Sequence, residues 1–150
     1  MCTPQCFNSD AMQPDLRAAA RLAGASLDID ESIRAHAAWS RRLSGYIAKH
    51  EEDLLDAEQI ADERCCVLGQ WLHTDGHKHL GGYHCFTELL DLHKQFHIEA
   101  ARVVSLSQDL KTAEAQAGLH GELTRLSDEI SRHLQALKAM LQQDEDEKLI

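Results

Sequence analysis

The chain has 150 residues, of which 43% are hydrophobic and 5% aromatic, and its formal net charge is -10 with the histidines neutral. This length suits one domain with a usable core. The negative charge excludes nucleic acid and anionic membranes as partners, because binding to either needs clustered Lys and Arg.

The composition favours helices throughout. Only 2 Pro and 8 Gly are present, while strong helix formers such as Ala, Leu and Glu are abundant, so we expect an all-α fold. No apolar run approaches the roughly 20 residues that span a bilayer. The start of the chain lacks the basic and apolar regions of a signal peptide, so we expect a cytoplasmic protein. In that setting its 5 cysteines should stay reduced rather than form a disulfide framework.

Residues 1–13 show no periodicity and are predicted to form a flexible N-terminal tail. Cys2 and Cys6 are interpreted as exposed thiols rather than metal ligands. A short first helix should begin near Pro14, which suits a first helical turn, and end at Gly24.

A firmer helix follows from about Asp28. Its apolar positions step by three, four and seven residues, as an amphipathic helix requires, and they are Ile29, Ile33, Leu43 and Ile47. His36 falls on the same stripe, either as a core histidine or as a metal ligand. Trp39, one turn further on, is placed to pack beside it.

A second helix, straight or bent, is predicted from the apolar residues between Leu54 and Leu72 and should end before Gly76. It carries Cys65 and Cys66. On a helix, adjacent side chains point about 100° apart, so only one of the two should face a given site. The periodicity does not decide between them.

Residues 74–82 are predicted to form a loop because they contain three glycines. Four histidines crowd this region and form either a weak second metal site or, as we favour, a solvated group: His73, His77, His79 and His84. Cys85 is expected to be a small buried side chain rather than a ligand.

The third predicted helix carries two histidines on its inward stripe, between Phe86 and Val104. His93 and His97 lie one turn apart on the same face. Buried imidazoles need partners, and one metal ion would satisfy both. A cysteine and a third histidine from neighbouring helices would complete the four donors that zinc takes in closed sites.

A last helix shows a nearly seven-residue repeat of leucine and isoleucine, which is typical of a bundle or of a dimerising helix. The repeat comprises Leu119, Leu123, Leu126, Ile130, Leu134, Leu137 and Leu141. We predict an antiparallel four-helix bundle with an extra short N-terminal helix over residues 14–143. Residues 144–150 should form an acidic, solvated C-terminal tail.

Three ordered motifs resemble the bacterial chemoreceptor zinc-binding (CZB) domain family over about residues 29–104. They are His36-x-x-Trp39, Cys66-x-Leu68-Gly69-x-Trp71 and His93-x-x-x-His97. The resemblance implies a bundle that forms a homodimer and binds Zn²⁺ through His36, Cys66, His93 and His97. It thereby selects Cys66 over Cys65.

The resemblance also implies a regulatory role. Members of this family occur fused to chemoreceptors and diguanylate cyclases, where zinc or oxidants such as hypochlorous acid change the output. We therefore expect a sensory zinc site that signals to a partner of that kind, since this chain shows no catalytic or signalling domain of its own. A closed set of four ligands leaves no position for an activated water, so we do not expect an enzyme.

Two alternatives use the same residues differently. In the first, zinc only staples a dimeric scaffold. In the second, a haemerythrin-like di-iron bundle uses His84 and Glu88 together with His93 and His97. No Glu-x-x-His pair of the ferritin type is present. Gly69 is interpreted as a point where a helix passes close to another backbone.

Overall fold

The computed structural model describes residues 14–25, 27–49 and 55–148, and no strand occurs within these ranges. The all-α prediction is confirmed for this part of the chain. The predicted tail at residues 1–13, with Cys2 and Cys6, lies outside the described residues. The helical elements are α2 (Pro14–Gly24), α3 (Ile29–Lys49), α4 (Ala57–Ala61), the 3-10 helix η1 (Glu63–Cys65), α5 (Val67–Leu72), α6 (Asp75–Leu80), α7 (His84–Gln108), α8 (Thr112–Gly118), the π-helix η2 (Leu119–Leu123) and α9 (Thr124–Lys148).

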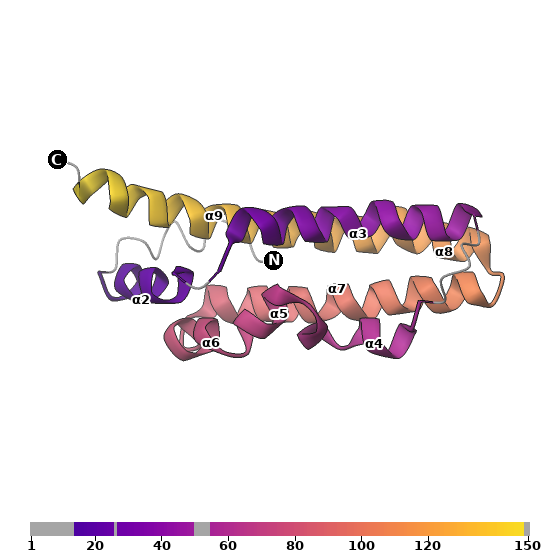
Figure 1. Ribbon diagram of the computed structural model, residues 1–150, viewed down its shortest axis with the longest axis horizontal. Helices are drawn as coiled ribbons and strands as arrows, with labels where there is room; N and C mark the ends of the chain where they lie inside the picture. The colour runs from indigo at the N-terminus through magenta and orange to yellow at the C-terminus, as the bar shows by residue number, and fades with distance from the viewer. Residues whose placement is uncertain (1–13, 26, 50–54, 149–150) are drawn as a thin grey trace.

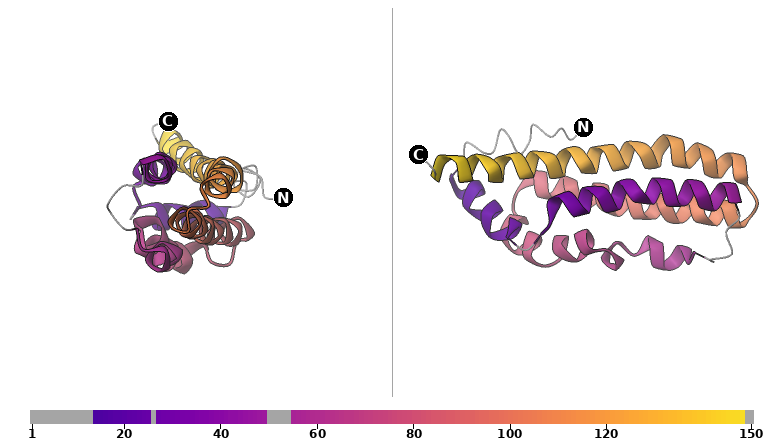
Figure 2. Two further views of the ribbon diagram at one scale, coloured as in Figure 1. Left: turned by 90° about the vertical axis from the view of Figure 1, so that its right-hand side faces the viewer. Right: turned by 45° about the horizontal axis from the view of Figure 1, so that its top comes forward.

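Three long helices, α3, α7 and α9, lie lengthwise beside one another and contact each other in pairs (Figures 1 and 2). The short helices from α4 to α6 run along α7 as a broken fourth segment, and α4 packs directly on α7. Followed from the N- to the C-terminus, α3 and α7 run in one direction, and the α4–α6 segment and α9 run in the opposite direction (Figure 1). The helices therefore alternate in direction.

The predicted stripe of α3 faces this core. Leu43 and Ile47 are fully or almost fully buried. His36, nearer the start of the helix, is also buried. On α7 the buried positions include Leu89, Phe96 and the two histidines. Both stripes thus turn their histidines toward the interior.

The second predicted helix is broken, and side-chain caps explain the breaks. The Asp56 carboxylate accepts hydrogen bonds from two backbone N–H groups at the start of α4, and Asp62 accepts one from Arg64 at the start of η1. Cys66 does the same at α5, where its sulfur accepts from the backbone N–H of Gly69 at 3.3 Å. Such caps compete with a continuous helix.

The predicted loop at residues 74–82 is wrong, because residues 75–80 form helix α6. Leu80 is fully buried. Gly76, which suggested a loop, permits tight packing instead: a Cβ there would lie 2.9 Å from the Trp71 carbonyl oxygen and 3.0 Å from the Phe86 ring. Trp71 in turn donates from its indole nitrogen to the Ala23 carbonyl at 2.8 Å, which ties α5 to α2.

The last predicted helix is present as α8, η2 and α9, which follow one another without a break. Its repeat is buried from Leu119 through Leu137, whereas the environment of the Leu141 side chain is not described. Helix α9 continues to Lys148, past residue 143, the predicted end of the bundle. None of the helices in the described ranges has the length and apolar character of a membrane span.

Candidate metal centre

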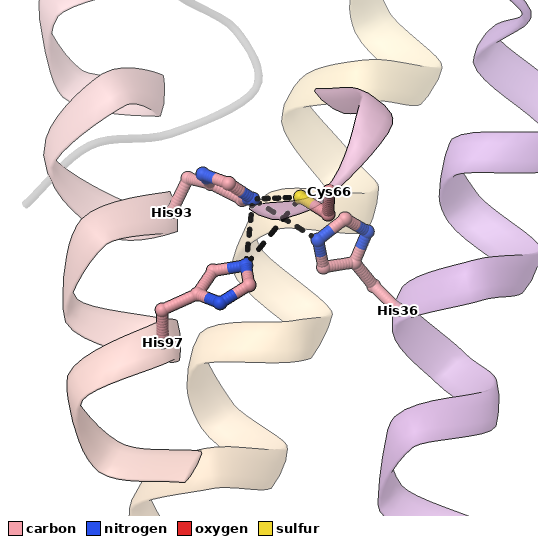
Figure 3. A group of neighbouring side chains, drawn as sticks. All are labelled: His36, Cys66, His93 and His97. Carbon is pink, nitrogen blue, oxygen red and sulfur yellow. Dashed lines mark hydrogen bonds between the residues drawn. The ribbon is translucent and has the colours of Figure 1, made fainter. Parts of the chain in front are cut away.

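Four side chains from three separate segments converge in the interior. His93 and His97 project from consecutive turns of α7, and His36 projects toward them from α3 (Figure 3). The exposed fractions of these histidines are 3% for His36, 0% for His93 and 1% for His97. Cys66, the N-cap of α5, places a half-buried sulfur between them. The structure thus brings together all the predicted ligands.

The distances between the donor atoms match those around a single ion. His93 Nε2 lies 3.1 Å from His36 Nε2, 3.1 Å from His97 Nε2 and 3.2 Å from Cys66 Sγ. Cys66 Sγ lies 3.5 Å from His97 Nε2. A tetrahedral zinc ion with nitrogen ligands at about 2.0 Å and sulfur at about 2.3 Å separates its donors by about 3.3 to 3.6 Å. These four distances are within a few tenths of an ångström of that, and all four donor atoms lie within 4.8 Å of one another.

The backbone fixes which ring nitrogens can bind a metal. His36 Nδ1 lies 2.8 Å from the Ser32 carbonyl oxygen, and His97 Nδ1 lies 2.8 Å from the Ile60 carbonyl oxygen. Because a carbonyl oxygen only accepts, each Nδ1 must carry the proton and donate it. In the neutral rings the Nε2 atoms of His36 and His97 are therefore unprotonated, and both point at the centre.

The environment keeps the three rings neutral. Burial lowers the pKa of His36 and of His97, although the carbonyl partner of each ring acts in the opposite direction. Burial, with the neighbouring rings of His36 and His97, lowers the pKa of His93 to about 2. Neutral imidazole is the form that binds a metal. The Nε2 atoms of the three neutral rings face one another and need a common partner. One cation between them would provide it.

Cys66 sits differently from a cysteine within a helix. Its backbone is extended, with φ -114° and ψ 160°, and its sulfur accepts from Gly69 N–H at the helix start. Burial raises the pKa of the Cys66 thiol, while the Gly69 N–H lowers it. A metal ion would tip this balance fully toward the thiolate.

The predicted close approach at Gly69 is confirmed. A Cβ added there would lie 1.7 Å from the Glu63 carbonyl oxygen and 3.2 Å from His93 Cε1. No side chain fits in that space without moving the backbone. Gly69 therefore lets α5 lie against both η1 and the ring of His93.

The other predicted candidates do not join the cluster. Cys65 ends η1 and is an exposed free thiol. Cys85 is fully buried, as expected, but it is disulfide-bonded, so the prediction that the cysteines stay reduced is wrong for this residue. Trp39 is partly buried against the core, and the guanidinium of Arg42 lies 5.1 Å from its ring.

The four histidines around α6 are dispersed. His73 Nε2 contacts Glu63 Oε1 at 2.6 Å, and His84 Nε2 contacts Glu88 Oε1 at 2.7 Å. His77 stacks edge-on against Phe86 with ring centroids 6.1 Å apart. Among the described residues, only His36, Cys66, His93 and His97 form a group of donors close enough to hold one metal ion.

Two polar residues near the core were not predicted from the sequence. Glu63 is partly buried and borders the cluster, and no periodic signal marks it. His133 on α9 is fully buried, with Nδ1 2.8 Å from the Glu129 carbonyl oxygen. The steps from Leu126 to Ile130, His133 and Leu137 are four, three and four residues, so the seam pattern could have identified His133.

Residues 36–104 match the family model described as "Chemoreceptor zinc-binding domain", CZB. No curated protein and no solved structure matches the chain. The resemblance drawn from the three motifs is therefore confirmed over this segment. The match also agrees with the donor set, since three imidazoles and one thiolate are a combination that suits zinc.

Proposed function

We propose that His36, Cys66, His93 and His97 bind one Zn²⁺ ion and that the protein is a sensory module built on this site, since residues 36–104 match the model of the chemoreceptor zinc-binding domain. The observation that carries the proposal is the convergence of four buried or half-buried donors on one point. Their number fills the coordination of zinc, which suits sensing or structure better than hydrolysis.

The chemistry of such a site resides in its sulfur. When bound, zinc holds Cys66 as a thiolate, the form that reacts with oxidants. The chain gives small molecules a route to this atom: a pocket of about 320 Å³ opens between the start of α3 and residues 65–68, and both His36 and Cys66 line it. The half-buried sulfur is thus accessible to a small oxidant while the histidines stay buried.

The position of Cys66 at a helix start converts its chemical state into a change of shape. The sulfur that faces the histidines also caps α5 through Gly69 N–H. A sulfur that is oxidised or released from zinc loses its place in the cluster, which weakens this cap. Trp71 on α5 holds Ala23 at the end of α2, so loosening of α5 reaches a second helix.

We further propose that this change is read by a partner such as a chemoreceptor or a diguanylate cyclase. The family description, which names chemoreceptors, supports this output. An antiparallel four-helix bundle that forms a homodimer is part of the same proposal. The cytoplasmic location remains a prediction from the sequence.

Zinc content tests the core of the proposal. Protein purified anaerobically without chelator should contain one zinc per chain by elemental analysis, and Cys66→Ser should contain much less. Cys65→Ser is the matched control, because Cys65 is the exposed neighbour of the same residue type, and it should retain full zinc. Absence of zinc from the wild type, or equal zinc in Cys66→Ser, would refute the site.

Oxidant sensing needs a separate measurement. Treating the zinc-loaded protein with one to a few equivalents of hypochlorous acid should release zinc to a chromogenic chelator. The peptides around Cys66 should then exchange backbone amide hydrogens faster, and so should those of α5 and α2. If zinc stays bound and Cys66 is unmodified, the site acts as a structural staple, and the sensory part of the proposal fails.

A further inference from the structure

Two buried side-chain atoms in the described residues have no hydrogen-bond partner, namely Glu63 Oε2 and His93 Nδ1. A buried polar atom without a partner costs about 1 to 3 kcal/mol, so native structures rarely retain one. His93 is part of the candidate metal centre, and the backbone of Glu63 borders it, with its carbonyl oxygen 3.5 Å from Cys66 Sγ. Two unpartnered atoms in neighbouring residues call for a common explanation.

The backbone of Glu63 and the ring of His93 both lie against Gly69. A Cβ at that glycine would approach the Glu63 carbonyl oxygen at 1.7 Å and His93 Cε1, the ring atom between Nδ1 and Nε2, at 3.2 Å. The Glu63 side chain extends from there to His73, where Oε1 lies 2.6 Å from Nε2. His73 is the C-cap of α5, one helical turn after Gly69. The carboxylate therefore lies along the helix that borders the His93 ring.

The unpartnered nitrogen of His93 sets this ring apart from the other two. Figure 3 shows His93 with one nitrogen in the cluster and the other pointing away from it. The corresponding Nδ1 atoms of His36 and His97 donate to the carbonyl oxygens of Ser32 and Ile60. His93 has no such carbonyl, although it contacts all three other donors.

We propose that Glu63 is a positioning residue for His93, with Oε2 accepting the Nδ1–H hydrogen bond, directly or through one water, once zinc holds Nε2. This inference rests on the proposed zinc ligands. A ring whose Nε2 binds a metal must carry its proton on Nδ1 and needs an acceptor there, while a carboxylate oxygen needs a donor. The two unpartnered atoms are thus complementary.

A carboxylate that accepts from His93 Nδ1 affects the ring more strongly than a backbone carbonyl would. It makes the imidazole a stronger ligand, fixes its orientation and adds negative charge beside a cationic site. His73 holds the other oxygen of Glu63 and is itself partly exposed. Glu63 therefore connects the buried ring to the protein surface, and its role is to tighten zinc binding and slow zinc release.

Zinc affinity measured by chelator competition provides the first test. Glu63→Ala should weaken zinc binding by about 10- to 100-fold, the range found for such partners. Glu63→Gln, whose amide oxygen still accepts but carries no charge, should lie between this variant and the wild type. Glu58→Gln on α4 is the control, because Glu58 is an exposed carboxylate, and it should bind as the wild type does.

The NMR signal of the His93 Nδ1–H tests the proposal further, because it would not change if Glu63 only stabilised the fold. In zinc-loaded protein with ¹⁵N-labelled histidine, this N–H should resonate downfield and exchange slowly. Its signal should shift upfield or disappear in Glu63→Ala, while the His36 and His97 signals stay in place. Glu63→Gln keeps the test open if Glu63→Ala fails to fold.

The outcomes separate this inference from the proposed site. Wild-type affinity in both Glu63 variants, or an unchanged His93 Nδ1–H signal in Glu63→Ala, overturns the role of Glu63 while zinc still binds. A wild type without zinc, or Cys66→Ser with full zinc, overturns the ligand assignment itself.

Discussion

Two groups of histidines in this protein differ in their burial and in the partners that their rings contact. His36 and His97 are buried, their Nδ1 atoms are tied to backbone carbonyls, and their Nε2 atoms face a common centre with His93. His77 and His84 lie nearer to each other in sequence, yet they contact unrelated neighbours, Phe86 and Glu88. Convergence of rings from separate helices, rather than a high local density of histidine, makes a site.

The cause of this difference is the face of the helix on which each ring falls. His93 and His97 continue the apolar stripe of the long helix α7, so folding itself desolvates them. Helix α6 is short, and its buried residues, Gly76 and Leu80, are four apart. His77 and His79 lie between these two positions in sequence, so they lie beside the buried face of α6, and His77 is exposed and His79 partly exposed.

Removal of zinc should give the largest effect. With free zinc at about 1,000 times its Kd, the bound ion should add about 4 kcal/mol to the free energy of unfolding, because it binds the folded chain. A strong chelator should abolish this gain in the wild type, as measured by denaturant unfolding with and without chelator. A triple variant of His77, His79 and His84 to alanine should show the same loss. An unaffected wild type would mean that the buried group holds no metal.

Single substitutions should then separate the two groups by affinity. His36→Ala, His93→Ala and His97→Ala should each weaken zinc binding by more than about 100-fold, because loss of a ligand exceeds the loss of an outer partner. The triple variant of the surface histidines should keep wild-type affinity by chelator competition. The comparison fails if the triple variant loses zinc and the single variants do not.

Two glycines extend the comparison from ligands to packing. Gly69→Ala should destabilise the protein by about 1 to 3 kcal/mol and weaken zinc binding, because the added Cβ would overlap the Glu63 carbonyl oxygen. Gly69→Leu should do more. Gly82→Ala is the control, since nothing lies within 4 Å of a Cβ at that position. Equal melting temperatures for Gly69→Ala and Gly82→Ala would refute the close-approach interpretation.

The parts of this fold that could be predicted are those in which a long amphipathic pattern dominates. Helices α3 and α7 are long enough for their stripes to place His36, His93 and His97 inside. The choice of Cys66 over Cys65 came from the family resemblance, because periodicity could not make it. In the structure the two are not on one helix, since Cys65 ends η1 and Cys66 caps α5.

The breaks between α4, η1 and α5 could not be predicted from periodicity because they depend on individual capping hydrogen bonds. Aspartate is a common N-cap residue, but periodicity does not show whether Asp56 and Asp62 each cap a new helix or stay within one. A cysteine sulfur as an N-cap is not a usual signal. Gly76 led to the wrong loop prediction for a related reason. A glycine needed for close packing cannot be told in the sequence from a glycine in a loop.

The smallest effect should come from the pair at the start of α7. His84 contacts Glu88 at 2.7 Å, but its side chain is 77% exposed. Solvent screens such a contact, so His84→Ala should change the free energy of unfolding by no more than about 0.5 kcal/mol and should leave zinc stoichiometry unchanged. Denaturant unfolding and elemental analysis of the same sample measure both quantities. A loss of metal in this variant would show that His84 takes part in metal binding, which a haemerythrin-like site requires and a closed site of His36, Cys66, His93 and His97 does not.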